Sequence, residues 1–144
     1  MIRFAKRNLA LALCLGLAVG ATACAKKTAE NPAATTEVSV TGVDLGRSIG
    51  GDKRVTERAD QFGPNDVIYA SVLTSGTSPS AILKARWTYE DGQLVDEAEQ
   101  AIAPAGVTAS EFHVSKPDGW PVGKYRVEVY LNGTPAMSKE FQVK

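Results

Sequence analysis

The sequence has 144 residues, with 16 basic and 16 acidic side chains and two cysteines. This balance argues against nucleic acid as a partner, because nucleic-acid-binding domains carry an excess of Lys and Arg. Cys14 lies in a segment that we expect to be removed. Cys24 alone then remains, so no internal disulfide can hold the domain together. A folded part of about 105 residues can instead rely on an apolar core.

The first twenty residues are typical of a secretory signal. Residues 1–8 hold three basic residues and no acid, and residues 9–20 form an apolar run. A membrane-spanning helix needs about 20 apolar residues, so this run is too short to be one. A basic start, a short apolar run and a small-residue end make up a signal peptide, which we place at residues 1–23. Its removal leaves 13 basic and 16 acidic residues, a net charge of −3.

Two kinds of cleavage are compatible with residues 21–24, Ala-Thr-Ala-Cys. Ala21 and Ala23 satisfy the A-x-A rule of ordinary signal peptidase, which would leave a soluble periplasmic protein with an unpaired thiol. The same residues resemble the lipobox of bacterial lipoproteins, although Ala21 stands where that family usually has Leu. This resemblance implies that Cys24 carries a diacylglyceryl group on its thiol and becomes the first residue of a membrane-anchored protein.

A linker separates Cys24 from the rest of the chain. Residues 24–36 are rich in Ala, Thr, Lys and Glu without hydrophobic periodicity, a composition typical of a flexible tether. Lipoproteins carry two or three acyl chains on this cysteine. Because each buried CH₂ contributes about 0.8 kcal/mol, such an anchor is effectively permanent. In lipoproteins an Asp directly after the cysteine retains the protein in the inner membrane, and this chain has Ala25 there. The resemblance therefore also implies an outer-membrane location facing the periplasm.

Residues 37–144 have the two-residue periodicity of β-strands. The alternation predicts seven strands, near residues 38–43, 66–76, 81–89, 94–102, 107–114, 123–131 and 136–143. An eighth forms if Arg54–Thr56 pairs, within a segment (50–63) otherwise predicted as a loop. Turn signals recur about every 8 to 12 residues, Asn132-Gly133 among them, which is the spacing of a β-sandwich. The sequence therefore predicts one all-β antiparallel sandwich domain at residues 37–144.

Residues 121–133, PVGKYRVEVYLNG, resemble the penultimate strand of an immunoglobulin-like sandwich. In that family a small residue and a Tyr two positions later open the strand, and the Tyr forms the tyrosine corner. Gly123 and Tyr125 match this pattern, whereas Val127 stands where the family's second cysteine falls. Trp87 takes the mid-chain position of the family's core Trp. The resemblance implies an immunoglobulin-like antiparallel β-sandwich of seven to eight strands, with no antibody-type disulfide.

Residues with catalytic chemistry are few. His113 is the single histidine; alternation places it on the solvent side of its strand beside Glu111, and no G-x-S-x-G motif is present. Asp96, Glu97 and Glu99 could supply a glycosidase carboxylate pair, or could protect an edge strand by charge. No companion residues with metal-ligand spacing accompany His113. The sequence therefore predicts a protein that is not an enzyme and needs no metal or cofactor.

A polar sheet face is the first candidate for binding. Alternation puts Lys84 and Arg86 outward, opposite to Trp87, and immunoglobulin topology sets the strand at 123–131 beside them. The candidate binding face consists of Lys84, Arg86, Lys124, Arg126 and Tyr130. A partly basic face with an aromatic side chain suits an envelope protein or an anionic glycan. The alternative is an ordinary soluble surface, in which salt bridges interleave with these cations.

Trp120 is the second candidate. It lies in a loop rich in Pro and Gly, where an exposed Trp can anchor a carbohydrate or a protein partner. The alternative is a lid that folds over the end of the sandwich.

The function indicated by these features is a non-enzymatic binding or accessory module of the cell envelope, tethered to the membrane through Cys24. A structural spacer, or a subunit of an envelope assembly, is the main alternative. A soluble periplasmic protein and a cell-wall hydrolase are further interpretations that the sequence favours less.

Overall fold

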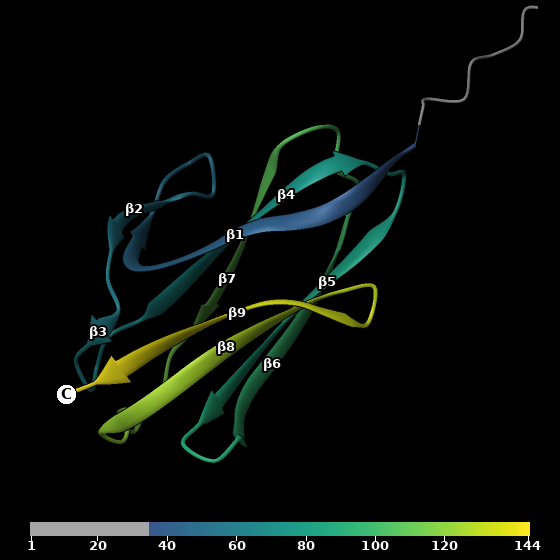
Figure 1. Ribbon diagram of the computed structural model, residues 1–144. Coiled ribbons are helices and arrows are strands. Elements are labelled where there is room, and N and C mark those ends of the chain that lie inside the picture. The colour runs from purple at the N-terminus through teal and green to yellow at the C-terminus, as the bar shows by residue number, and fades with distance from the viewer. Residues whose placement is uncertain (1–34) are drawn as a thin grey trace, which may run out of the picture. The chain divides into compact units, whose positions relative to one another are not determined.

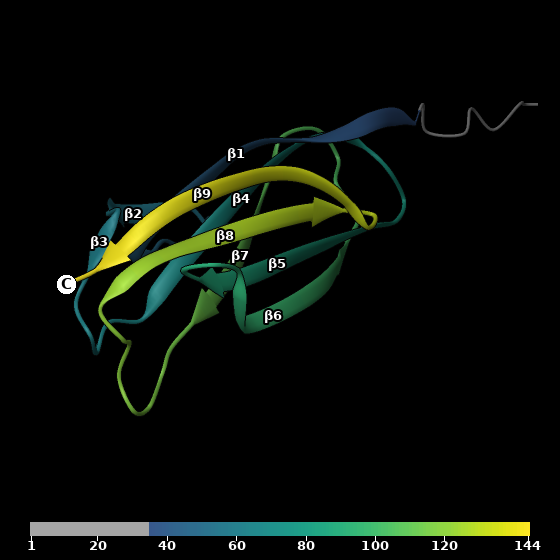
Figure 2. The same ribbon diagram turned by 60° about the horizontal axis from the view of Figure 1, so that its bottom comes forward.

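The computed structural model describes residues 35–144. Two β-sheets pack face to face (Figures 1 and 2). The first sheet has the order β2 (Val55–Arg58), β1 (Thr36–Ile49), β4 (Ile68–Thr77), β7 (Thr108–Val114). The second has the order β3 (Gln61–Phe62), β9 (Thr134–Val143), β8 (Gly123–Leu131), β5 (Ala81–Tyr89), β6 (Gln93–Ile102). No helix in residues 35–144 is long and apolar enough to cross a membrane.

The predicted all-β sandwich is confirmed, with more strands than the seven or eight expected. The eighth strand, β2, pairs antiparallel with β1 and sets Val55 opposite Ile49. The ninth, β3, pairs in parallel with β9, with Phe62 opposite Val143. Two residues are too few to show a two-residue period, so this strand was missed. Its role is nevertheless structural, because Phe62 is 2% exposed and belongs to the core.

β1 is longer than the strand predicted at 38–43, and a β-bulge explains the difference. The register with β4 shifts between Val40 and Gly42, so the valines at 40 and 43 both contribute to the interior although their spacing is odd. An inserted residue breaks a strict two-residue alternation without ending the strand. Beyond the bulge, Leu45 is 1% exposed and continues the core.

Aromatic side chains from the second sheet occupy one part of the core. The Trp87 ring meets Phe141 edge-on at 5.9 Å between centroids, and Tyr125 stacks on Phe141 at 5.2 Å. Trp87 is 1% exposed and Tyr125 is 3% exposed, so both predicted core positions are confirmed. The Tyr125 hydroxyl donates to the carbonyl oxygen of Pro121 at 2.7 Å. This bond to the backbone a few residues upstream is the tyrosine corner that the sequence predicted.

The predicted hairpin at Asn132-Gly133 joins β8 to β9. Leu131 pairs with Thr134, and both turn residues have positive φ, 50° for Asn132 and 82° for Gly133. Two consecutive positive φ angles define the type I′ turn that matches strand twist. The Asn132 side chain also accepts a hydrogen bond from the backbone N–H of Ile82 at 2.9 Å, which ties this turn to the start of β5.

Candidate functional site

The candidate binding face lies on the outer side of the second sheet. β5 and β8 are neighbours, with Lys84 opposite Tyr130 and Arg86 opposite Glu128. The adjacency inferred from immunoglobulin topology is therefore confirmed. This register sets Lys84 against a tyrosine and Arg86 against an acid, which agrees with the alternative in which acids interleave with the cations.

Carboxylates from the flanking strands pair with the cations. The Lys84 ammonium lies 3.4 Å from a Glu97 oxygen and 3.6 Å from a Glu99 oxygen, both on β6. Its hydrogen bond to Glu97 and the charges of both carboxylates raise the pKa of Lys84. Arg126 on β8 pairs with Glu140 on β9 at 2.6 Å. That hydrogen bond raises the pKa of Arg126 and lowers the pKa of Glu140, so the pair is charged at neutral pH.

Arg86 is held differently from the other cations. It stands between Glu97 on β6 and Glu128 on β8 in the strand register. Its Nε atom is buried and has no hydrogen-bond partner in the described part of the chain. The Tyr130 hydroxyl donates to the Glu128 carboxylate at 3.2 Å, so this acid has Tyr130 as a hydrogen-bond partner while Arg86 lies opposite it in the strand register. A ligand group that accepts hydrogen bonds could approach this guanidinium, and it would also meet the carboxylates beside it.

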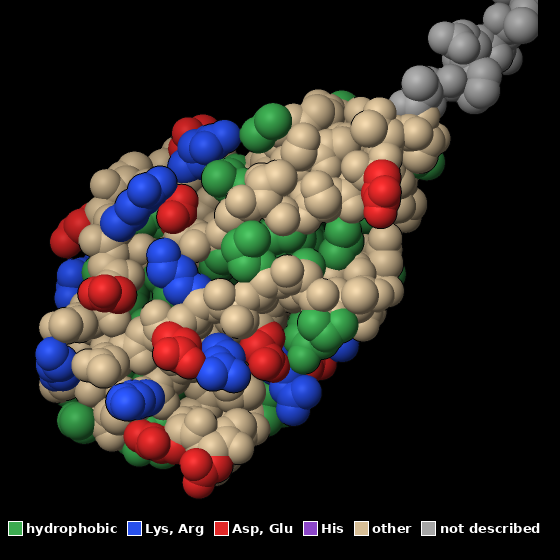
Figure 3. Space-filling view, viewed as in Figure 1, with side chains coloured by type: hydrophobic (Ala, Val, Ile, Leu, Met, Phe, Trp, Pro, Cys, Tyr) green, Lys and Arg blue, Asp and Glu red, His purple; other side chains and the backbone are tan. Residues whose placement is uncertain are grey.

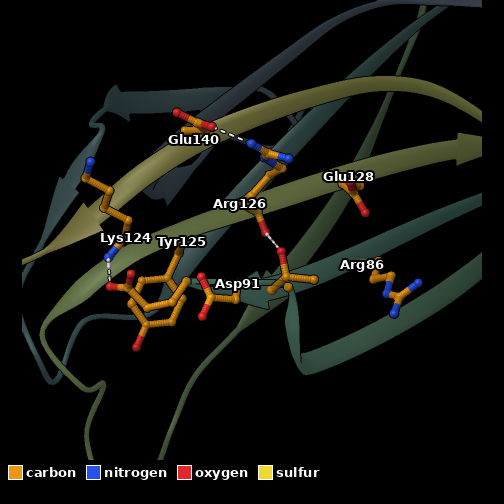
Figure 4. A pocket seen from close by; sticks show the side chains of 10 residues that line it. Arg86, Asp91, Lys124, Tyr125, Arg126, Glu128 and Glu140 are labelled. Atoms are coloured by element: carbon orange, nitrogen blue, oxygen red, sulfur yellow. Dashed lines mark hydrogen bonds and ion pairs between the residues drawn. The ribbon is translucent and has the colours of Figure 1, made fainter.

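Three cations of the candidate binding face, Arg86, Lys124 and Arg126, line a shallow cavity of about 410 Å³, shown in Figure 4. Lys84 and Tyr130 do not line it. Thr88 is 7% exposed, and its hydroxyl donates to the Arg126 carbonyl oxygen at 3.4 Å. The charged residues of the lining are Arg86, Lys124, Arg126, Glu90, Asp91, Glu128 and Glu140. Three cations and four acids leave the cavity close to neutral. It lacks the continuous positive charge that would attract a polyanion.

The acids of this site were not part of the sequence-based face. Glu90 and Asp91 belong to the turn between β5 and β6, and a Glu90 oxygen accepts the backbone N–H of Lys124 at 3.1 Å. Alternation identified the outward positions on β5 and β8. It also identified the carboxylate cluster of β6, but not that Glu97 and Glu99 pair with Lys84, nor that Glu140 on β9 and the acids of this turn join the face, since those contacts follow from pairing between distant segments.

Trp120 forms a lid over this end of the sandwich, so the lid interpretation is confirmed and the interpretation as an exposed loop anchor is wrong. The side chain is 3% exposed, and its indole N–H donates to the Asp66 carbonyl oxygen at 2.9 Å. Its ring meets Tyr125 edge-on at 5.4 Å. The loop carries the indole inward because its apolar surface completes the aromatic cluster at this end of the core. Such a buried ring cannot present a face to a partner.

The groups considered for catalysis are separated from this cavity. His113 on β7 is exposed, and its Nδ1 lies 3.3 Å from a Glu111 oxygen. Glu97 and Glu99 flank Lys84 in ion pairs. Residues 35–144 contain no group of three or more His, Cys, Asp or Glu side chains placed to hold a metal ion. The signal peptide, Cys24 and the linker up to residue 34 lie outside the described residues.

Comparisons with known proteins identify the fold. The chain is similar to an immunoglobulin-like protein from Pseudomonas aeruginosa, with 17% identity, a TM-score of 0.54 and coverage of 77% of this chain and 99% of the other. It is also similar to the CARDB domain of a Pyrococcus furiosus protein, solved in complex with di-metal ions, with 13% identity, a TM-score of 0.50 and coverage of 77% and 90%.

A β-glucosidase from Erythrobacter marinus matches with 10% identity and a TM-score of 0.53, over 76% of this chain but 16% of the enzyme. No family model matches the chain, and no curated protein matches it. Likeness at these identities carries no activity across. Residues 35–144 form an all-β domain with nine strands in two sheets and an immunoglobulin-like fold.

Proposed function

We propose that this protein is a non-enzymatic accessory module of the bacterial cell envelope, anchored to the outer membrane through a lipidated Cys24 and facing the periplasm. One arrangement carries the proposal: a cysteine directly ends a signal-like apolar segment, and a linker without hydrophobic periodicity leads from it to an immunoglobulin-like sandwich. A lipid at Cys24 would keep such a domain at the membrane surface while leaving it free to meet a partner.

The anchor is tested by growing cells that express the protein with radiolabelled palmitate. Wild type should incorporate label and Cys24→Ser should not. Cys14→Ser is the matched control: it removes the other cysteine, which lies within the predicted signal peptide, and should leave labelling unchanged. Separating the two membranes by density then tests the outer-membrane location. If Cys24→Ser remains with membranes after a high-salt wash, attachment does not run through this residue.

The partner we propose is another envelope protein, bound at the candidate binding face. The mixed charges of the cavity lining suit a protein surface of mixed polarity better than an anionic glycan. Capture from detergent-solubilised envelopes with the lipidated wild type, followed by mass spectrometry, should recover a protein that Arg86→Gln loses. Lys116→Gln, in the loop between β7 and β8, removes one positive charge outside this cavity and should not affect recovery.

A structural spacer is the second candidate function. The ion pairs of Lys84 and Arg126 favour it, because a face whose cations already have partners gains less from an external one. The same capture separates the two candidates: equal recovery with wild type and Arg86→Gln would support the spacer.

A further inference from the structure

The two ends of the sandwich differ sharply in charge. The strand pairings bring the start of β1 and three loops to one end, since Thr36 pairs with Thr77, Thr74 with Thr108 and Ala81 with Ile102. We call the residues there the neutral end: 35–36, 78–80, 103–107 and 132–133. None of them is charged.

The loops of the opposite end, 50–54, 63–67, 90–92 and 115–122, form the charged end. They hold eight charged side chains: Asp52, Lys53, Arg54, Asp66, Glu90, Asp91, Lys116 and Asp118. In Figure 3, acidic and basic side chains crowd one part of the visible surface and are sparse around the start of β1. Glu37 adjoins the neutral end in sequence, and the next charges along the chain are Lys84, Glu99, Glu111 and Glu128, each four residues from it.

Apolar exposure does not distinguish the ends. Val107 at the neutral end is 68% exposed, and Val122 at the charged end is 66% exposed. The two ends differ in the number of charged side chains that would enter a region of low water content together with such a valine. At the charged end it would bring ionised groups, each costly to remove from water. At the neutral end it would bring one, the exposed Glu37, which follows Thr36 and lines the same pocket as Ser78 and Asn132.

Three backbone N–H groups at the neutral end already have backbone partners. The Ser78 N–H donates to the Pro104 carbonyl oxygen at 3.0 Å, and the Gly106 N–H donates to the Gly76 carbonyl oxygen at 2.9 Å. The Asn132 N–H donates to the Ile82 carbonyl oxygen at 2.8 Å. A surface whose donors are satisfied internally loses few hydrogen bonds when it leaves bulk water.

The chain to the proposed anchor also leaves from this end. Thr35 follows Cys24 by eleven residues, so the two are at most about 40 Å apart even in a fully extended chain. Lys26 and Lys27 come directly after the anchor, where cationic side chains are attracted to anionic headgroups. This connection allows the neutral end to reach the bilayer surface, although it does not by itself orient the domain.

We propose that the neutral end rests against the interfacial region of the bilayer to which Cys24 is attached. The charged end then points away from the lipid, and the domain stands upright with the candidate binding face exposed along its side. This inference rests on the proposed lipid anchor. The partner surface is the bilayer itself, recognised by the low number of charges at this end, by backbone N–H groups that are already paired and by the exposed Val107.

The test uses the chain from Cys24 to Lys144, with the Cys24 thiol coupled to a maleimide lipid in nanodiscs that contain phosphatidylglycerol. A gadolinium-chelating lipid in the same discs broadens the NMR signals of nearby methyl groups. Wild-type protein should show stronger broadening at Ile82 and Val107 than at Val122. Chemical coupling makes the result independent of lipidation in cells, so failed palmitate labelling and failed docking are separate outcomes.

A matched pair of variants separates docking from mere tethering. One charge at an anionic surface is worth about 1 kcal/mol, so Val107→Glu should lower the ratio of docked to free domain about fivefold and weaken broadening at Ile82. Val122→Glu adds the same charge to an equally exposed valine and should leave Ile82 unchanged. Equal effects of the two variants would overturn the proposal. So would stronger broadening at Val122, or signal changes at Ile82 and Val107 with protein concentration in the absence of discs, which would indicate a second copy instead.

Discussion

Replacing Tyr125 by Phe removes one hydroxyl and keeps the aromatic ring. The hydroxyl donates to the Pro121 carbonyl oxygen at 2.7 Å, while the ring stacks on Phe141 and meets Trp120 edge-on. Because the Phe ring fills the same space, Tyr125→Phe isolates the tyrosine-corner hydrogen bond from aromatic packing.

The expected cost follows from the burial of this bond. A net hydrogen bond contributes about 0.5–1.5 kcal/mol, and leaving a buried acceptor without its donor costs about 1–3 kcal/mol. Tyr125 is 3% exposed but Pro121 is exposed, so water can partly replace the donor at this carbonyl oxygen and the lower of the two ranges applies. We expect Tyr125→Phe to lower the free energy of unfolding by about 0.5–1.5 kcal/mol, a measurable part of the roughly 5–15 kcal/mol typical of a domain.

The same hydroxyl makes the stability depend on pH in the alkaline range. Burial, together with the nearby Tyr89 and Glu90, raises the pKa of Tyr125 to about 12. In the unfolded chain a tyrosine titrates near pH 10. The folded-state pKa is the higher one, so this contribution is complete below pH 10 and is lost as the pH rises from 10 towards 12. At pH 11 the loss should be about 1 kcal/mol.

Urea denaturation of wild type and Tyr125→Phe at pH 8 and pH 11, followed by tryptophan fluorescence, measures both effects. The other titrating groups are common to the two proteins, so the difference between them isolates Tyr125. Wild type should lose about 1 kcal/mol more than the variant between the two pH values. A cost below about 0.5 kcal/mol at pH 8, or parallel pH profiles, would show that this hydrogen bond does not contribute as argued.

Two further predictions concern the core and the support of the lid. Trp87→Ala should lower the free energy of unfolding by about 3–5 kcal/mol, as truncation of large buried aromatic side chains does. Urea denaturation followed by Trp120 fluorescence measures this cost, and a value under about 1 kcal/mol would mean that Trp87 is not part of the core. Hydrogen bonds from the Gly63 N–H and from Arg47 lower the pKa of Asp66, so its contribution is complete above its ordinary value of 3.8 and is lost as the pH falls through the lower folded-state pKa. Between pH 6 and pH 2.5, wild type should therefore lose more stability than Asp66→Asn, and equal losses would contradict this linkage.

Much of the fold could be predicted from local patterns in the sequence. The alternation around Trp87, the Asn132-Gly133 turn and the spacing of Gly123 and Tyr125 each depend on residues close together in the chain. Side-chain direction in a strand alternates whatever the strand pairs with. For this reason the strands, the hairpin and the core aromatics could be predicted from the sequence, and the adjacency of β5 and β8 followed from the immunoglobulin resemblance.

Pairing between distant segments decided the rest. β3 forms because Phe62 pairs with Val143, which lies far from it in the sequence. Its two residues are too few to show the periodicity of a strand. Glu140 reaches Arg126 only through the register of β9 with β8, so the face predicted as basic is close to neutral. Trp120 packs inward because its indole N–H donates to the Asp66 carbonyl oxygen and its ring packs edge-on against Tyr125. The sequence by itself determined which residues form strands and which side chains share a face, because these depend on neighbours along the chain. Which charges meet, and which aromatic is covered, depended on register between strands, and that is set by the packing of the whole sandwich.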